Sequence, residues 1–317
     1  MNETAVPLSD MLPRALPWLL AILGGFIGSF LNVCIHRMPA HRSVVFPGSA
    51  CPKCGAAIRP WNNIPVVSWF VLRGRCASCR APISFRYPFI EALTGALFLA
   101  AWARFGPTLA LAEALVLLPA LVVLFFTDLD ERILPDLVTI PVAAAGLALS
   151  PFRTGLWLPW IEARTQGPLP PFLVALATAL AGASAFWLLG RSWRLFRPGI
   201  DTAIGFGDVK LMAMIGAFLG PVLALLTVFL GSLAGTLLFL FSWAVSAALG
   251  GGTGREPGPL RPLARALESA GFLHEGRGAG MLDLVPFGSM LAAGAAIALF
   301  FGERIVRFYL AASGLSG

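Results

Sequence analysis

Asp128 and Asp208 are carboxylates that stand where an apolar chain tolerates charge least. Asp128 ends one hydrophobic run, and Asp208 opens another. A carboxylate at or inside a bilayer boundary is costly unless it is paired or faces water, so by default it marks a functional site. If the two carboxylates meet, they share one proton and titrate as a pair. Because such a pair activates water and polarises a scissile carbonyl in aspartic proteases, it predicts peptide hydrolysis without an acyl-enzyme.

Asp128 also has a purely structural interpretation. It is followed by Asp130, Glu131 and Arg132, which together are typical of a solvated helix end. Pro135 and Asp136 then indicate a turn and the start of the next helix. Taken alone, Asp128 therefore leaves a polar helix terminus and a functional carboxylate equally open.

Asp208 shifts this balance towards function. Gly205 and Gly207 lie just ahead of it at a helix entry, where glycines permit close backbone approach and a local break in the helix. An extended peptide or water could then reach the carboxylate. Asp208 could instead be a helix N-cap, and Lys210 offers a nearby charge partner.

Four of the five cysteines predict a metal site. Cys51 and Cys54 form one C-x2-C pair, Cys76 and Cys79 form a second, and 21 residues separate the pairs. This spacing is close to that of tetrahedral four-cysteine zinc sites, which are structural because four thiolates leave no position for water. Two disulfides are the alternative, but they are rare in the reducing cytoplasm, where the topology below places this segment. Cys34 lies in an apolar run and is expected to pack as a small hydrophobe.

The composition identifies an integral membrane protein. Of the 317 residues, 57% are hydrophobic and 12% are charged, and the mean hydropathy is +0.81. Apolar runs long enough, or nearly long enough, to span a bilayer predict an all-α polytopic protein of about eight transmembrane helices. These runs cover 15–35, 89–104, 109–127, 137–150, 172–190, 205–219, 222–248 and 284–301.

The segment 36–88 sets the predicted orientation, because it carries eight lysines and arginines and no acid. The positive-inside rule places it in the cytoplasm as a small zinc domain between the first two helices. Alternation of the helices then brings Asp128 and Asp208 to the same, cytoplasmic, side. This bias and anionic lipid headgroups explain the net charge of +7, so we expect no nucleic-acid partner.

Three regions follow from this pattern: an N-terminal segment with the first helix at 1–35, the zinc domain at 36–88, and a helical core at 89–317. Within the core, the Gly/Pro/Arg-rich segment 250–283 is predicted to be a flexible cytoplasmic loop.

The chain resembles the type IV prepilin leader peptidases, also called prepilin peptidase/N-methyltransferases. The residues from Gly28 to Arg37 are similar to the first-helix motif of that family. The stretch from Cys51 through Asn62-Asn63-Ile64-Pro65 and Leu72–Cys76 to Arg86-Tyr87-Pro88 and Glu91 is similar to its cytoplasmic domain. In the family, an aspartate seven residues before a proline pairs with the aspartate of Gly-x-Gly-Asp. The resemblance thus implies that Asp128 and Asp208 are the catalytic dyad, with Asp130 and Asp136 as the next candidates.

The resemblance also implies a two-step activity in the bacterial inner membrane. The dyad would cut a short basic leader from prepilins or pseudopilins at the cytoplasmic membrane face. The same protein would then methylate the new N-terminal amine with S-adenosylmethionine as donor. The sequence has no glycine-rich Rossmann fingerprint, so we place the donor site near the second helix, around Glu91 and Gly95.

Two other classes of function remain open at this stage. A proton-coupled transporter would use the intramembrane acids as a relay and would not need a four-cysteine domain. A membrane scaffold that docks partners through the zinc domain would not depend on either aspartate.

Overall fold

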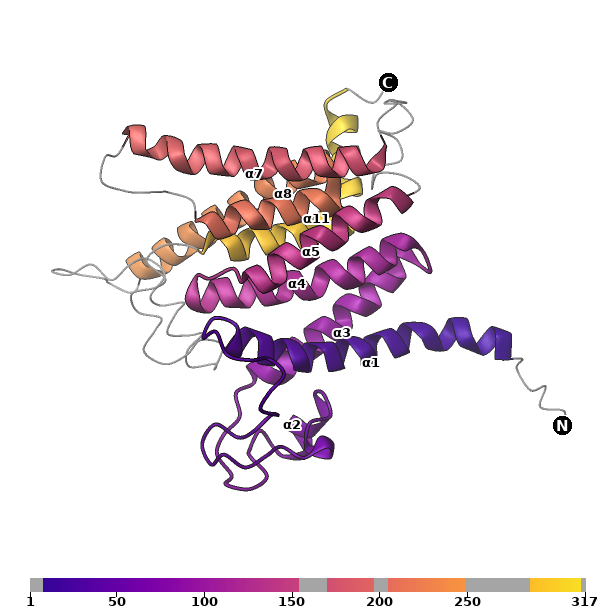
Figure 1. Ribbon diagram of the computed structural model, residues 1–317, viewed down its shortest axis with the longest axis vertical. Helices are drawn as coiled ribbons and strands as arrows, with labels where there is room; N and C mark the ends of the chain where they lie inside the picture. Colours follow the sequence, from indigo (N-terminus) through magenta and orange to yellow (C-terminus); the bar gives the residue numbers. More distant parts are fainter. Residues whose placement is uncertain (1–7, 154–169, 197–204, 249–285, 315–317) are drawn as a thin grey trace. The chain divides into compact units, whose positions relative to one another are not determined.

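The computed structural model describes residues 8–153, 170–196, 205–248 and 286–314. Within these residues all regular elements are helices, and the only strand pairing is two isolated bridges. The elements are α1 Leu8–Arg37, η1 Pro60–Asn62, α2 Val67–Val71, α3 Arg86–Phe105, α4 Leu109–Glu131, α5 Asp136–Leu149, η2 Ser150–Phe152, α7 Pro171–Phe196, α8 Phe206–Ala248 and α11 Phe287–Ala312 (Figure 1). The predicted loop 250–283 lies outside the described residues.

Six described helices are long and apolar enough to cross a membrane: α1 from Ala15, α3, α4, α7 to Trp193, α8 to Phe241, and α11. The sequence predicted eight, and the difference has two sources. α5 is too short to count by length, and the runs 205–219 and 222–248 join as α8. Counted as separate segments, α5 and the two parts of α8 restore the predicted number. The fold is thus the expected all-α polytopic membrane protein.

The break inside α8 lies at Gly220, which has φ 69° and ψ 179° and is followed by Pro221. Because proline has no N–H, the carbonyl of Ala217, one turn earlier, loses its helical donor. The buried guanidinium of Arg153 donates to this carbonyl at 3.0 Å and also reaches the carbonyl of Gly146 in α5 at 3.5 Å. A side chain from the end of η2 therefore completes the hydrogen bonding that the helix cannot supply.

The chain divides into two compact units, Met1–Pro119 and Ala120–Gly317. In the first unit α1 packs along α3. The helices approach closely, since a Cβ on Gly28 would lie 2.7 Å from Cα of Glu91, and one on Gly95 would lie 2.8 Å from the carbonyl of Ala21. In the second unit α8 packs against α5, α7 and α11, and the ribbons of α7, α8 and α11 lie side by side (Figure 1).

Four buried threonine hydroxyls find their partner one turn earlier in the chain, which keeps them satisfied in a bilayer. Thr94, Thr127, Thr139 and Thr227 each donate to the carbonyl one turn earlier. By contrast, many large apolar side chains face outward. Those on α1 include Trp18, Leu19, Ile22, Leu23, Phe26 and Phe30. This inverted distribution is that of helices surrounded by lipid.

Candidate active site and metal centre

Asp128 lies near the end of α4 and its side chain is buried, with 6% exposed. Its Oδ2 atom faces the first turn of α11. The backbone N–H of Ser289 donates to Oδ2 at 2.6 Å, and Oγ of Ser289 lies 2.8 Å from the same oxygen. Oγ of Ser289 is also 3.1 Å from the carbonyl of Phe125, so its single proton can serve either acceptor. The start of α11 thus fixes the orientation of the Asp128 carboxylate.

Asp208 lies in the first turn of α8 and is half-buried. α8 begins at Phe206, so Asp208 is a residue of the helix and not its N-cap. Its N–H donates to the carbonyl of Gly205 at 3.1 Å. The carboxylate of Asp208 is close enough to Asp128 for their negative charges to repel each other. The fold therefore brings together the two carboxylates that the sequence singled out.

Leu134 packs between the first turn of α8, which carries Asp208, and the first turn of α11, which holds the Asp128 carboxylate. It lies in the short connection from α4 to α5 and is buried. A Cβ on Gly207 would lie 3.0 Å from Cβ of Leu134, and a Cβ on Gly288 would lie 3.0 Å from its Cδ1. The Cβ of Gly288 would also be 3.0 Å from Cγ and Oδ2 of Asp128. Small residues at both helix entries therefore allow the backbone to approach the carboxylates.

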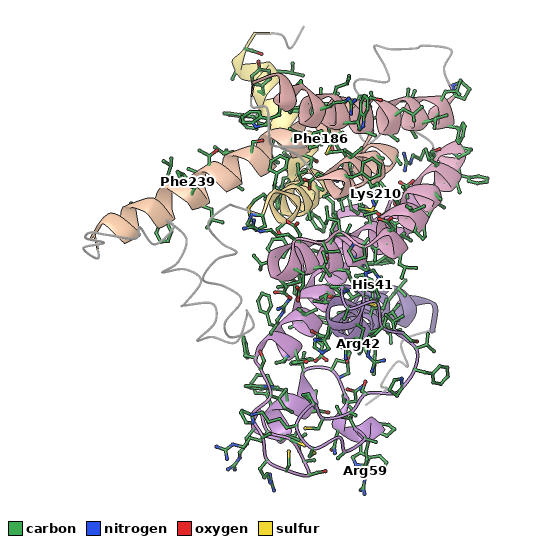
Figure 2. All side chains as sticks on the ribbon, turned by 60° about the vertical axis from the view of Figure 1, so that its left-hand side comes forward. His41, Arg42, Arg59, Phe186, Lys210 and Phe239 are labelled. Carbon is green, nitrogen blue, oxygen red and sulfur yellow. The ribbon has the colours of Figure 1, made fainter. Side chains whose placement is uncertain are left out.

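The other acidic and basic residues predicted for this site lie around it. Asp136 opens α5, is 59% exposed and forms an ion pair with Lys210 of α8. Lys210, labelled in Figure 2, also lies over the ring of Phe206, with 5.3 Å from its Nζ to the ring centroid. Asp130 is half-buried. Lys210, expected as a partner of Asp208, thus pairs with Asp136 and joins α5 to α8.

Ser289, Gly288 and Leu134 were not predicted from the sequence. Gly288 and Ser289 have a weak signal, because Pro286-Phe287-Gly288-Ser289 opens an apolar run with a proline, a small residue and a hydroxyl, as helix starts often do. Leu134 has none. Nothing in that pattern indicates which carboxylate the hydroxyl meets, 161 residues away.

The four predicted metal ligands meet in the first unit. The sulfur atoms of Cys51, Cys54, Cys76 and Cys79 all lie within 4.8 Å of one another. All four are free thiols, which leaves the disulfide alternative without support. Sγ of Cys51 and Sγ of Cys79 are 3.9 Å apart, and two ligands of a tetrahedral zinc with bonds of about 2.3 Å are separated by about 3.8 Å. The donor set and its spacing therefore fit zinc.

Each cysteine pair sits on the same kind of turn. The N–H of Cys51 donates to Ala56 O and that of Cys76 to Ala81 O. The chain turns back through positive φ directly after each pair, at Gly55 (φ 70°), as predicted, and at Arg80 (φ 61°). These turns aim backbone N–H groups at sulfur.

Backbone N–H groups in these turns lower the pKa of two of the thiols. The N–H groups of Cys79 and Ser78 lower the pKa of Cys76 to about 6. Those of Cys54 and Lys53 lower the pKa of Cys51. A turn that stabilises thiolate also prepares it for a metal ion, because the thiolate is the ligand form. Cys34, the fifth cysteine, is buried in α1 and is not one of the grouped ligands, as expected.

Glu91 and Gly95 have structural contacts in the first unit. Oε2 of Glu91 accepts a hydrogen bond from the N–H of Val66 at 2.6 Å, and Gly95 packs against the backbone of Ala21. Neither contact offers a place for S-adenosylmethionine. Their predicted part in methyl transfer stays a prediction.

Comparisons with known proteins agree with this arrangement. The family profile described as the bacterial peptidase A24 N-terminal domain matches residues 22–105. The profile of the type IV leader peptidase family matches residues 115–240. The first match contains all four clustered cysteines, and the second contains both aspartates. No solved structure matches the chain.

Curated relatives share the same name, prepilin leader peptidase/N-methyltransferase. The one from Pseudomonas aeruginosa is 32% identical, over 98% of this chain and 99% of its own length. The one from Neisseria gonorrhoeae is 38% identical over 72% of this chain and 82% of the relative. The Myxococcus xanthus relative is 44% identical, but the match covers 63% of this chain and 55% of that protein.

Proposed function

Since the chain belongs to the type IV leader peptidase family, we propose that it cleaves the leader peptide of type IV prepilins or pseudopilins and then methylates the new N-terminal amine. The observation that carries the peptidase assignment is the position of Asp208, in the first turn of α8, near enough to the buried Asp128 for their charges to interact. The family match leaves the transporter alternative without support.

The hydrogen bonds of Asp128 suggest how its carboxylate works. Oδ2 faces the Ser289 N–H and therefore acts as an acceptor. This leaves Oδ1 as the oxygen that takes the proton from the attacking water. Asp208, protonated, would then donate to the scissile carbonyl and polarise it, as in other carboxylate pairs that share one proton. When the tetrahedral intermediate collapses, the proton held by Asp128 passes to the leaving amine.

We place the dyad at the cytoplasmic face of the bacterial inner membrane. The support is the segment 36–88, with eight cations and no acid, which the positive-inside rule assigns to the cytoplasm. Asp128 ends the third predicted span and Asp208 opens a later one. A prepilin whose basic leader stays on the cytoplasmic side would present its cleavage site at this level.

The residues of this chain fit a zinc ion better than they fit S-adenosylmethionine. Zinc fits the four cysteines, and its role would be to hold the 36–88 domain together. S-adenosylmethionine would supply the methyl group that the new amine accepts. We keep Glu91 and Gly95 as the proposed neighbourhood of the donor, although their contacts in the structure are with protein.

The test is cleavage of a purified prepilin in detergent by the wild type, Asp128→Asn and Asp208→Asn, with mass spectrometry of the product N-terminus. Loss of cleavage in both variants, with a wild-type product carrying one added methyl group, is the expected result. Asp136→Asn is the matched control, because this exposed carboxylate pairs with Lys210 and should leave cleavage largely intact. Unimpaired cleavage by either dyad variant would move the catalytic role to Asp130 or Asp136.

A further inference from the structure

The segment Ile64–Leu72, which contains α2, begins beside the middle of α1, at the depth of the first membrane span. A Cβ on Gly25 of α1 would lie 3.4 Å from Cβ of Pro65. Gly25 is near the middle of the candidate span Ala15–Arg37. At 1.5 Å per residue it lies about 18 Å along α1 from Arg37, where the segment 36–88 begins. The chain therefore reaches back along α1 before α2 starts.

The backbone entering α2 has the hydrogen bonding that a low-dielectric environment demands. The N–H of Val66 is bonded to the carboxylate of Glu91, which lies within the candidate span of α3. The N–H of Ile64 donates to Oγ of Ser68 at 2.9 Å. Irregular backbone at membrane depth is tolerated where protein satisfies its polar groups. Val66 even keeps a φ of 63° here, a strained value for a β-branched residue.

α2 itself has two distinct faces. Its inner face carries Ser68, which is buried and donates to the carbonyl of Trp61, and Trp69, whose Nε1 donates to the carbonyl of Ile83 at 3.0 Å. Its outer face carries Val67, Phe70 and Val71, which are 54%, 61% and 74% exposed. Three neighbouring large apolar side chains on so short a helix are costly in water.

The charge of the segment that contains α2 matches an anionic membrane surface. The segment 36–88 has eight lysines and arginines and no acid. In Figure 2, Arg59 lies at the opposite end of this segment from His41 and Arg42, which follow α1. Apolar side chains flanked by cations are typical of elements that lie in the membrane interface, buried about 5–10 Å below the headgroups.

We propose that residues 64–72 form a re-entrant segment that inserts into one leaflet beside α1 and α3, with Val67, Phe70 and Val71 in contact with lipid acyl chains. The side chain of Glu91 satisfies the backbone where this segment enters the bilayer. The first unit would then be anchored to lipid by more than its transmembrane helices. This inference does not depend on the catalytic assignment.

Photocrosslinking in nanodiscs tests the proposal with a matched pair of phenylalanines. The photoreactive residue p-benzoylphenylalanine replaces Phe70 in one full-length variant and Phe46 in another. Phe46 is 76% exposed and lies next to Pro47, whose carbonyl accepts a hydrogen bond from Arg37 at the end of α1. We expect several-fold more lipid adducts at Phe70 than at Phe46, as measured by peptide mass spectrometry.

Val71, on the same face, provides a second position if the Phe70 variant fails to fold, which zinc content and prepilin cleavage monitor. Lipid adducts at Phe70 and Val71 that do not exceed those at Phe46 would overturn the proposal, since the face would then meet water. Adducts to an added prepilin that replace the lipid adducts would also overturn it, and would identify α2 as a substrate-docking surface.

Discussion

The backbone N–H and the hydroxyl of Ser289 both lie within hydrogen-bonding distance of Oδ2 of Asp128, at 2.6 Å and 2.8 Å. α4 and α11 therefore meet at the carboxylate. The N–H belongs to the first turn of α11, where helical N–H groups have no partner within the helix. Asp128 satisfies one of these groups, and in return its carboxylate is held in one orientation.

Ser289→Ala should lower the rate of prepilin cleavage while the backbone N–H still holds Asp128. A hydrogen bond to a charged group stabilises the folded arrangement by about 1.5–3 kcal/mol. We expect the less firmly oriented carboxylate to lower kcat by about tenfold, which is about 1.4 kcal/mol of activation free energy. The measurement is steady-state cleavage of a purified prepilin. Ser289→Thr retains the hydroxyl and should keep most of the activity. Equal rates for Ser289→Ala and the wild type would show that the hydroxyl donates to Phe125 instead.

Gly288→Ala and Gly294→Ala should separate activity from stability on one helix. A Cβ at Gly288 would lie 3.0 Å from the Asp128 carboxylate, a side chain that can move, so cleavage should fall while the fold persists. A Cβ at Gly294 would lie 2.8 Å from the carbonyl of Thr227 and 2.9 Å from the N of Gly231, where backbone must move. We expect Gly294→Ala to lower the unfolding temperature more. The reverse order of the two effects would contradict the assigned contacts.

Cys76→Ser should release zinc and destabilise the 36–88 domain, whereas Cys34→Ser should leave the zinc content unchanged. The measurement is metal content of the purified protein, with zinc release followed by a chromogenic chelator. Full zinc occupancy in Cys76→Ser would contradict a four-cysteine site.

The zinc site should also respond to pH. The pKa of Cys76 is lowered from 9.0 to about 6. The stabilisation of its thiolate is therefore fully present above pH 9 and is lost as the pH falls through about 6. Zinc release should accelerate as the pH falls, because protons compete with zinc for the thiolates. A zinc release rate that stays constant between pH 7.5 and 5 would contradict proton competition for the thiolates.

Arg153→Met should lower the stability of the second unit, because it leaves the carbonyl of Ala217 without a donor beside Pro221. An unsatisfied buried polar group costs about 1–3 kcal/mol, and the measurement is the unfolding temperature in detergent. The control is Arg307→Met. Arg307 pairs with Glu303 on the exposed face of α11, and such pairs contribute about 0–1 kcal/mol. Similar unfolding temperatures for both variants would mean that Ala217 finds another donor.

The sequence by itself determined the class of the protein, the metal ligands and the two acids. Apolar runs must become helices in a bilayer because no water can satisfy their backbone, and two C-x2-C pairs bring four thiolates together through local turns. The aspartates stood out because charge at these positions is costly. Each of these signals lies within a short stretch of sequence, so a single sequence is enough to recognise them.

Only the tertiary structure decided what surrounds these residues. Ser289 meets Asp128, Leu134 packs between Gly207 and Gly288, and Lys210 turns to Asp136 instead of Asp208. The start of α2 lies against Gly25 and Glu91. These contacts join residues far apart in the chain, and they depend on how helices pack, which the spacing of apolar residues does not specify. The break at Gly220 likewise depends on Arg153, a distant side chain that supplies the donor Pro221 lacks.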